Sequence, residues 1–114
     1  MGQLIEGVWH TEDLSRTNAS GEFERKQSDY RSFLGSEKFK AEAGRYHLFV
    51  NAGCPWAYRA ILYRSIKNLS ELISVSYSRP EAGLEGWTFG EPEPLLGAVH
   101  MHQVYTAANP SFTG

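Results

Sequence analysis

The residues best suited to do chemistry surround a single thiol. Cys54 is the only cysteine in the chain and lies in the segment Tyr46-His-Leu-Phe-Val-Asn-Ala-Gly-Cys-Pro-Trp56. This order predicts an apolar strand, a short turn, and a helix that begins at Pro55, because proline suits the first helical position. A thiol at a helix N-terminus lies at the positive end of the helix dipole, which favours the nucleophilic thiolate. We therefore expect Cys54 to be a reactive nucleophile, although a lone cysteine is more often a small buried apolar residue.

The surroundings of Cys54 restrict that chemistry to one thiol. Ala57 stands where a Cys-x-x-Cys motif would have its second cysteine. An intramolecular dithiol cycle is therefore excluded, and a mixed disulfide on Cys54 must be resolved by an external thiol. A single cysteine, with no basic and apolar leader at the N-terminus, indicates a reducing, cytoplasmic setting.

Other polar clusters predict little chemistry. His100 and His102 are two residues apart on an expected helix, where such a pair does not share a face, so we expect no metal site. The glutamates at positions 81, 85, 91 and 93 are expected to solvate a loop. In the same loop Trp87 could either pin the loop to the core or donate its indole N–H to a peptide-like ligand.

Composition bounds the class of protein. The 114 residues are 41% hydrophobic and 13% aromatic, which is typical of one globular domain. Eleven basic and 13 acidic residues give a net charge of −2 without a basic block, so nucleic-acid binding has no electrostatic basis. No apolar run approaches the length of a membrane span.

The elements that must position Cys54 form a βαβ unit. Near-continuous apolar residues predict a strand at 45–51, and alternation predicts a second at 72–78, with a helix over 55–69 between them. Helical periodicity places apolar residues on one side of that helix and charged or amide residues, among them Arg59 and Arg64, on the other. The apolar side comprises Tyr58, Ile61, Leu62, Ser65, Ile66 and Leu69.

The remaining segments are less regular. Residues 1–44 are polar and are expected to form an irregular arm, residues 79–96 a long loop, and residues 97–108 a helix. The sequence predicts only two clear strands, and a two-stranded sheet buries too little surface to be stable alone. We therefore expect marginal stability and a chain that is the front portion of something larger.

Four motifs in order give the chain a family resemblance: Phe23-x-Arg25-x-x-Ser28-x-Tyr30-Arg31, Phe39-Lys-Ala-Glu-Ala-Gly-Arg-Tyr-His-Leu-Phe49, Cys54-Pro-Trp-Ala-Tyr-Arg59 and Gly86-Trp-Thr-Phe89. Together they resemble the glutathionyl-hydroquinone reductases, the xi-class glutathione transferases related to the omega class. The resemblance covers nearly the whole chain. It departs from the family at Tyr58, where histidine is usual, which should alter packing more than chemistry.

The resemblance implies an α/β, thioredoxin-like domain over 45–114, preceded by the 1–44 extension. It implies that Cys54 takes the glutathionyl group from a glutathionyl-hydroquinone, that a second glutathione resolves the mixed disulfide, and that Trp87 contacts glutathione. Glutathione is then the co-substrate, no metal is needed, and full-length members pair as homodimers. Family members continue into a strand with a cis-proline and an all-helical domain, which we expect to lie beyond residue 114.

Two alternatives remain open from the sequence. The chain could be a non-catalytic or incomplete fragment of such an enzyme, with weak affinity for glutathione. It could also be a monothiol-glutaredoxin-like module that removes glutathione from mixed disulfides.

Overall fold

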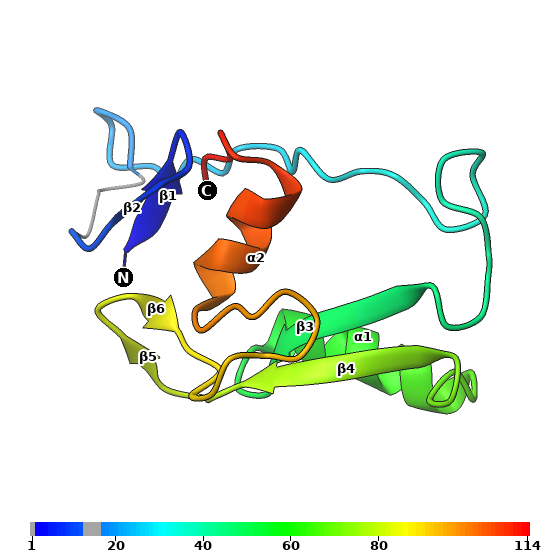
Figure 1. Cartoon of the computed structure of the whole chain (residues 1–114). Coiled ribbons are helices and arrows are strands. Elements are labelled where there is room, and N and C mark those ends of the chain that lie inside the picture. The colour runs from blue at the N-terminus through cyan, green and yellow to red at the C-terminus, as the bar shows by residue number, and fades with distance from the viewer. Residues whose placement is uncertain (1, 13–16) are drawn as a thin grey trace.

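A βαβ unit forms the centre of the fold in the computed structural model, which describes residues 2–12 and 17–114. It consists of strand β3 (Tyr46–Asn51), helix α1 (Pro55–Ile66) and strand β4 (Ile73–Ser78). The strands are parallel, with Tyr46 opposite Ile73 and Asn51 opposite Ser78 (Figure 1). The strand–helix–strand prediction is confirmed, with α1 ending earlier than the expected residue 69.

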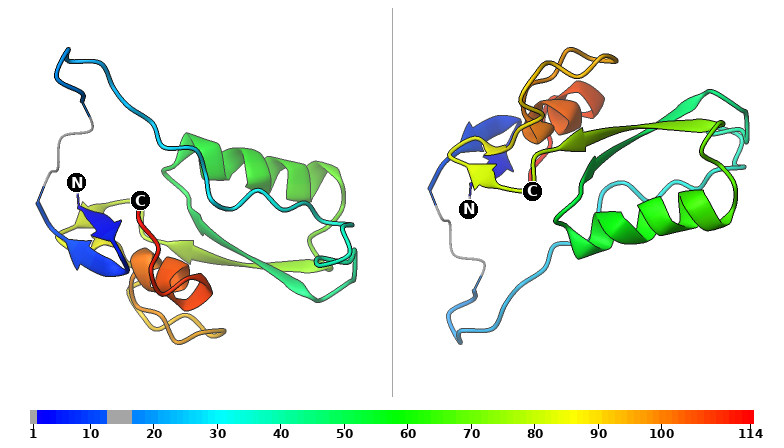
Figure 2. Two further views of the ribbon diagram at one scale, coloured as in Figure 1. Left: turned by 90° about the horizontal axis from the view of Figure 1, so that it is seen from above. Right: turned by 90° about the horizontal axis from the view of Figure 1, so that it is seen from below.

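Two helices lie on opposite sides of the β3–β4 ribbon, α1 on one side and α2 (Met101–Ala108) on the other (Figure 2). The predicted faces of α1 were wrong. Arg64 is half-buried and donates from Nε to the Ile73 carbonyl at 2.5 Å and from Nη2 to the Ser70 carbonyl at 2.8 Å. Ile66, placed on the apolar side, is 70% exposed. The guanidinium lies on the inner face because the Ser70 carbonyl, in the turn before β4, and the Ile73 carbonyl, at the start of β4, accept its hydrogen bonds.

The first residues form a hairpin, contrary to the irregular arm expected there. Strand β1 (Gln3–Ile5) pairs antiparallel with β2 (Val8–His10). The turn between them has positive φ angles at Glu6 (48°) and Gly7 (80°), as a two-residue hairpin turn requires. The hairpin docks on the end of the described chain, where Leu4 N and O pair with Gly114 O and N, both at 3.0 Å. Leu4 is only 2% exposed, so this contact buries part of the core.

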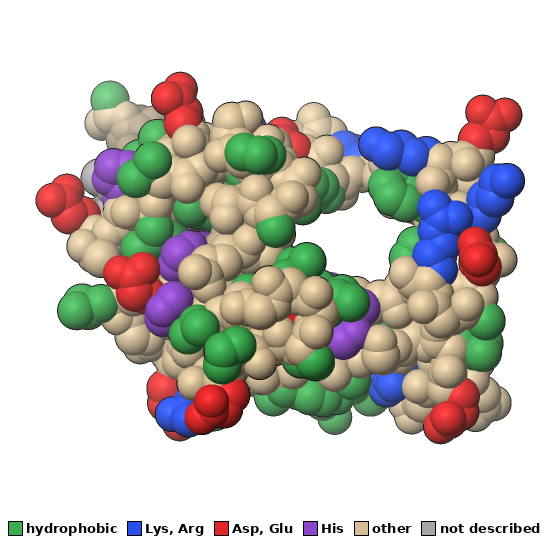
Figure 3. Space-filling view, in the orientation of Figure 1, with side chains coloured by type: hydrophobic (Ala, Val, Ile, Leu, Met, Phe, Trp, Pro, Cys, Tyr) green, Lys and Arg blue, Asp and Glu red, His purple; other side chains and the backbone are tan. Residues whose placement is uncertain are grey.

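Residues 24–45 form no helix or strand and are almost all exposed. We call residues 20–44 the arm. It runs from near the hairpin, past the start of α1, to the beginning of β3 (Figures 1 and 2). In the space-filling view an opening separates part of the arm from the rest of the molecule, with Lys and Arg side chains on one rim (Figure 3).

The predicted loop over 79–96 contains a tight hairpin, β5 (Ala82–Gly83) and β6 (Gly86–Trp87). The helix expected from residue 97 begins only at Met101. Residues before it are extended instead, because Phe89 N donates to Val99 O at 2.8 Å and Thr88 bridges His100. Neither α1 nor α2 is long and apolar enough to cross a membrane, and the described residues form no other helix.

Glu93 is buried, at 4% exposure, and does not solvate the loop as expected. Its carboxylate accepts backbone N–H bonds from Leu95 at 2.8 Å, Leu96 at 2.7 Å and Ala98 at 3.0 Å. Burial alone would raise the pKa of Glu93, but these three donors outweigh it and hold the pKa below its ordinary value. An ionised carboxylate therefore organises residues 93–98, which lead into α2.

Candidate functional site: a thiol at the start of α1

Cys54 occupies the position that the sequence predicted for a nucleophile. It is the N-cap of α1, with extended backbone angles (φ −88°, ψ 115°), and Pro55 is the first helical residue. Cys54 N donates to Asn51 O at 3.1 Å, and Tyr58 N donates to Cys54 O at 3.0 Å. The side chain is half-buried, and the first turn of α1 has no acidic residue. The thiol therefore lies at the positive end of the helix without a competing carboxylate in that turn.

The turn before Cys54 is fixed by a residue that sequence reasoning missed. Asn51, 2% exposed, ends β3 and accepts a hydrogen bond from Gly53 N at 2.8 Å. Its Nδ2 donates to Ser78 Oγ at 3.0 Å and to Arg79 O at 2.6 Å. One amide thus ties the turn to the end of β4. The signal in the sequence was a polar residue at the end of an apolar strand, directly before a Gly-Cys-Pro turn.

The arm contributes a charge beside the first turn of α1. The Arg25 guanidinium carbon lies 4.3 Å from the ring centre of Trp56, the second residue of α1. Trp56 is 61% exposed. The motif around Phe23 to Arg31 is therefore brought next to the first turn of α1, which the sequence order alone did not reveal.

An aromatic group joins the arm to α2 and the last described residues. Tyr30 of the arm stacks on Phe112 at 5.4 Å between ring centres, and Tyr105 of α2 stacks on Phe112 at 5.0 Å. Burial raises the pKa of Tyr105, and the nearby Tyr30 and Cys54 charges raise it further. Three aromatic rings thus hold the arm against α2 and the end of the described chain.

Trp87 lies in β6, half-buried, with Ala82 as its strand partner. The two indoles Trp87 and Trp9 differ in one respect. Trp9 Nε1 donates to Leu84 O at 2.9 Å. Among the described residues no acceptor for the Trp87 indole N–H is found. The contact of Trp87 with glutathione stays a prediction, and its N–H is available for a ligand.

The two histidines do meet, contrary to the sequence argument. Their rings stack at 5.4 Å with 3° between planes, because His100 is extended and stands outside the helix that holds His102. Trp9 also stacks on His102, and Glu85 Oε2 lies 3.2 Å from its Nε2. Burial lowers the pKa of His102 more than the Glu85 hydrogen bond raises it. In the described part of the chain no three His, Cys, Asp or Glu side chains are arranged to hold a metal ion.

The chain is similar in sequence to two glutathionyl-hydroquinone reductases. The chain is 44% identical over 119 residues to the glutathionyl-hydroquinone reductase PcpF of Sphingobium chlorophenolicum, and the match covers 100% of this chain and 38% of that protein. It is 37% identical over 129 residues to the glutathionyl-hydroquinone reductase YqjG of Escherichia coli, with 100% and 39% covered. The chain therefore spans less than half the length of the curated relatives it matches. No family model matches the chain.

Solved structures agree with the sequence matches. A xi-class transferase from Natrialba magadii superposes with a TM-score of 0.84 at 33% identity, over 99% of this chain and 37% of that one. The glutathione-bound structure of YqjG from Escherichia coli superposes with a TM-score of 0.75 at 34% identity, over 99% and 36%. The α/β, thioredoxin-like fold predicted from the sequence is confirmed. In sequence and in fold, the chain is similar to xi-class glutathione transferases and spans little more than a third of their length.

Proposed function

We propose that this chain carries the nucleophile of a glutathione-dependent reductase that converts glutathionyl-hydroquinones to hydroquinones. The observation that supports it most is the place of Cys54: a half-buried N-cap thiol at a strand–helix junction held by Asn51. The names of the curated relatives point to the same chemistry, since two of them are glutathionyl-hydroquinone reductases.

The reaction needs two thiols in sequence. The Cys54 thiolate attacks the sulfur of the glutathionyl group after the hydroquinone has tautomerised to its keto form. The carbon–sulfur bond breaks, and its electron pair restores the aromatic ring and leaves the former carbonyl oxygen as a phenolate, which takes a proton; the ring carbon keeps the hydrogen that it gained in the keto form. Cys54 and glutathione are then joined in a mixed disulfide. A second glutathione thiolate attacks this disulfide, which releases oxidised glutathione and restores the Cys54 thiolate. The chain has one cysteine, so the second thiol must be external.

Trp87 is the residue we assign to glutathione binding. Its indole N–H has no acceptor among the described residues and could donate to a peptide carbonyl or carboxylate. The setting we propose is a reducing cytoplasm, in which a lone thiol stays free. Homodimer formation and the helical domain expected beyond residue 114 stay predictions. The fragment and monothiol-glutaredoxin readings are the outcomes against which this function is tested.

The deciding experiment is intact-mass spectrometry of the chain after mixing with a glutathionyl-hydroquinone, beside Cys54→Ser. We expect an adduct of one glutathione on the unaltered chain only, together with free hydroquinone. Trp87→Phe, which keeps the ring and removes the N–H, should slow adduct formation.

Two results would contradict the proposal. The first is the absence of an adduct while Cys54 remains open to a small alkylating reagent, which favours an incomplete fragment. The second is an adduct from oxidised glutathione or a glutathionylated peptide but not from the glutathionyl-hydroquinone, which favours the glutaredoxin-like module.

A further inference from the structure

The arm holds an arginine that the proposed reaction does not use. Arg25 lies over the Trp56 ring at 4.3 Å and 5.7 Å from the ring centre of Phe23. A guanidinium stacked on an aromatic face keeps its edge N–H groups free for hydrogen bonds in the plane. Since Trp56 is two residues beyond Cys54, those donors lie beside the first turn of α1.

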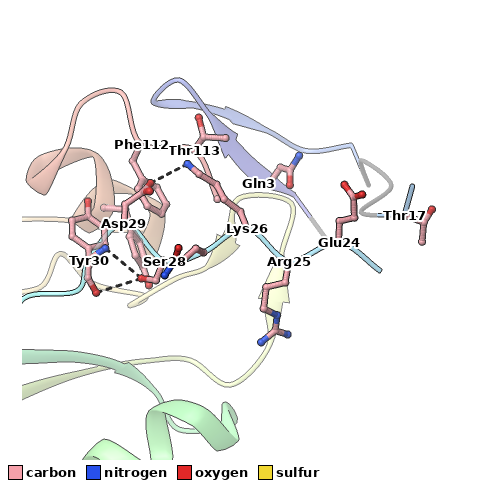
Figure 4. A pocket seen from close by; sticks show the side chains of 13 residues that line it. Gln3, Thr17, Glu24, Arg25, Lys26, Ser28, Asp29, Tyr30, Phe112 and Thr113 are labelled. Atoms are coloured by element: carbon pink, nitrogen blue, oxygen red, sulfur yellow. Dashed lines mark hydrogen bonds and ion pairs between the residues drawn. The ribbon is translucent and has the colours of Figure 1, made fainter. Parts of the chain in front are cut away.

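Arg25 has no carboxylate partner among the described residues. Its neighbour Glu24 extends to the opposite side of the arm (Figure 4). The nearby acid Asp29 is already paired with Lys26, with Nζ and Oδ2 3.0 Å apart. The positive charge of Arg25 is therefore uncompensated at this point of the surface.

A cavity of about 870 Å³ lies between the arm and the last described residues. One side of it is aromatic and is formed by Tyr30, Tyr105 and Phe112, which stack on one another as described above. Arg25 lines the same cavity (Figure 4). The Glu24 carboxylate also lines the cavity but points to the other side of the arm (Figure 4). The Arg25 side of the cavity thus offers an aromatic molecule a cation without a carboxylate partner among the described residues.

The cavity and the first turn of α1 are linked through Arg25, which lines the cavity and lies over Trp56. Trp56 is two residues beyond Cys54, the N-cap of that helix. A molecule whose anionic group meets Arg25 is therefore held beside the turn that carries the thiol.

From this arrangement we infer that Arg25 is a specificity residue for the molecule that reacts with Cys54: it binds a carboxylate or phenolate of that molecule, in the cavity lined by Tyr30, Tyr105 and Phe112. The inference rests on the proposed thiol chemistry of Cys54 and adds the class of substrate that the thiol prefers. The anion can come from the aromatic part of the substrate or from the carboxylates of glutathione.

The test is the rate at which Cys54 exchanges with three disulfides. Dithiobis(nitrobenzoate) is aromatic and carries carboxylates, dithiodipyridine is aromatic and neutral, and oxidised glutathione carries peptide carboxylates. In each case the Cys54 thiolate attacks one sulfur, the disulfide bond breaks, and one thiolate leaves with the electron pair. The two aromatic thiols are followed by absorbance and the glutathione adduct by mass. The full 114-residue chain is used throughout.

We expect Arg25→Gln to slow exchange with dithiobis(nitrobenzoate) about two- to fivefold at low salt, the range of a solvent-exposed charge pair. Exchange with dithiodipyridine should not change. The difference should shrink as salt is added, because the Debye length is about 10 Å at 0.1 M. Arg25→Lys should restore part of the rate. Arg31→Gln is the matched control, since it removes a charge from the same arm without touching Trp56.

The outcome with oxidised glutathione identifies the source of the anion. A slower rate means that Arg25 binds the carboxylates of glutathione, and an unchanged rate means that it binds the aromatic part. The inference is overturned if Arg25→Gln leaves the dithiobis(nitrobenzoate) rate unchanged, or if it slows all three exchanges equally, as a displaced arm would. The experiment needs only a free thiol, so it can fail while the glutathionyl-hydroquinone reaction succeeds, and the reverse.

Discussion

Replacing Asn51 by alanine should both destabilise the fold and disturb Cys54. The amide makes three hydrogen bonds, of 2.8 Å to Gly53 N, 3.0 Å to Ser78 Oγ and 2.6 Å to Arg79 O. Each is worth about 0.5–1.5 kcal/mol, and buried groups left unpaired cost more, so we expect a loss of about 2–4 kcal/mol in the free energy of unfolding. With a urea dependence of about 1–3 kcal/mol per M, the midpoint of unfolding should fall by roughly 0.7–4 M.

The second readout is the reaction of Cys54 with iodoacetamide at neutral pH, below the unfolding transition. Loss of the Gly53 bond frees the turn, and the thiol loses its fixed place where the dipole of α1 favours an anion. Since that effect is worth about 0.3–1 kcal/mol, the alkylation rate should fall about two- to fivefold. Ser78→Ala is the matched control: it removes one partner of Asn51 and should cost about 1 kcal/mol while leaving the rate unchanged. If Asn51→Ala keeps the alkylation rate of the unaltered chain, the turn is held by something other than this amide.

Three further substitutions test other parts of the fold. Leu4→Ala should lower the free energy of unfolding by about 2–5 kcal/mol in a urea titration, because Leu4 is 2% exposed, whereas Val8→Ala, at 60% exposed, should have little effect. Glu93 has a lowered pKa in the folded chain, so it stabilises the fold above its unfolded pKa near 4.5, and that stability is lost as pH falls through the lower folded value. The free energy of unfolding, measured from pH 7 downwards, should therefore fall less steeply with acid for Glu93→Gln than for the unaltered chain. Parallel curves for the two proteins would contradict this assignment. Arg64→Met should cost about 1–2 kcal/mol by chemical denaturation through loss of two hydrogen bonds to backbone carbonyls, while Arg59→Met, on the exposed side of α1, should change stability by less than about 0.5 kcal/mol.

The parts of the fold that follow from local signals could be predicted. An apolar run before Gly-Cys-Pro and an alternating run after the helix sufficed for β3, α1 and β4, and for the position of Cys54. The inner face of α1 could not be predicted, because periodicity treats every arginine as solvated. Arg64 is half-buried because the turn before β4 and the first residue of β4 each offer it a carbonyl acceptor.

The contacts that depend on distant segments were also beyond local reasoning. The first hairpin is too short to be stable alone, and its stability comes from residues about a hundred positions away. In the same way, nothing near Arg25 in the sequence indicates that it lies over Trp56. The irregular arm expected over residues 1–44 describes residues 24–44 but not the hairpin at residues 3–10, and its place beside the first turn of α1 required the three-dimensional arrangement.

The pairing of Leu4 with Gly114 also sets an order for folding during synthesis. Ribosomes add about 5–20 residues per second, so several seconds pass between the synthesis of β1 and that of Gly114, with which it pairs. All residues of the βαβ unit, 46–78, are made before Gly114. Every strand pairing of that unit is therefore available before the hairpin at the beginning of the chain can dock.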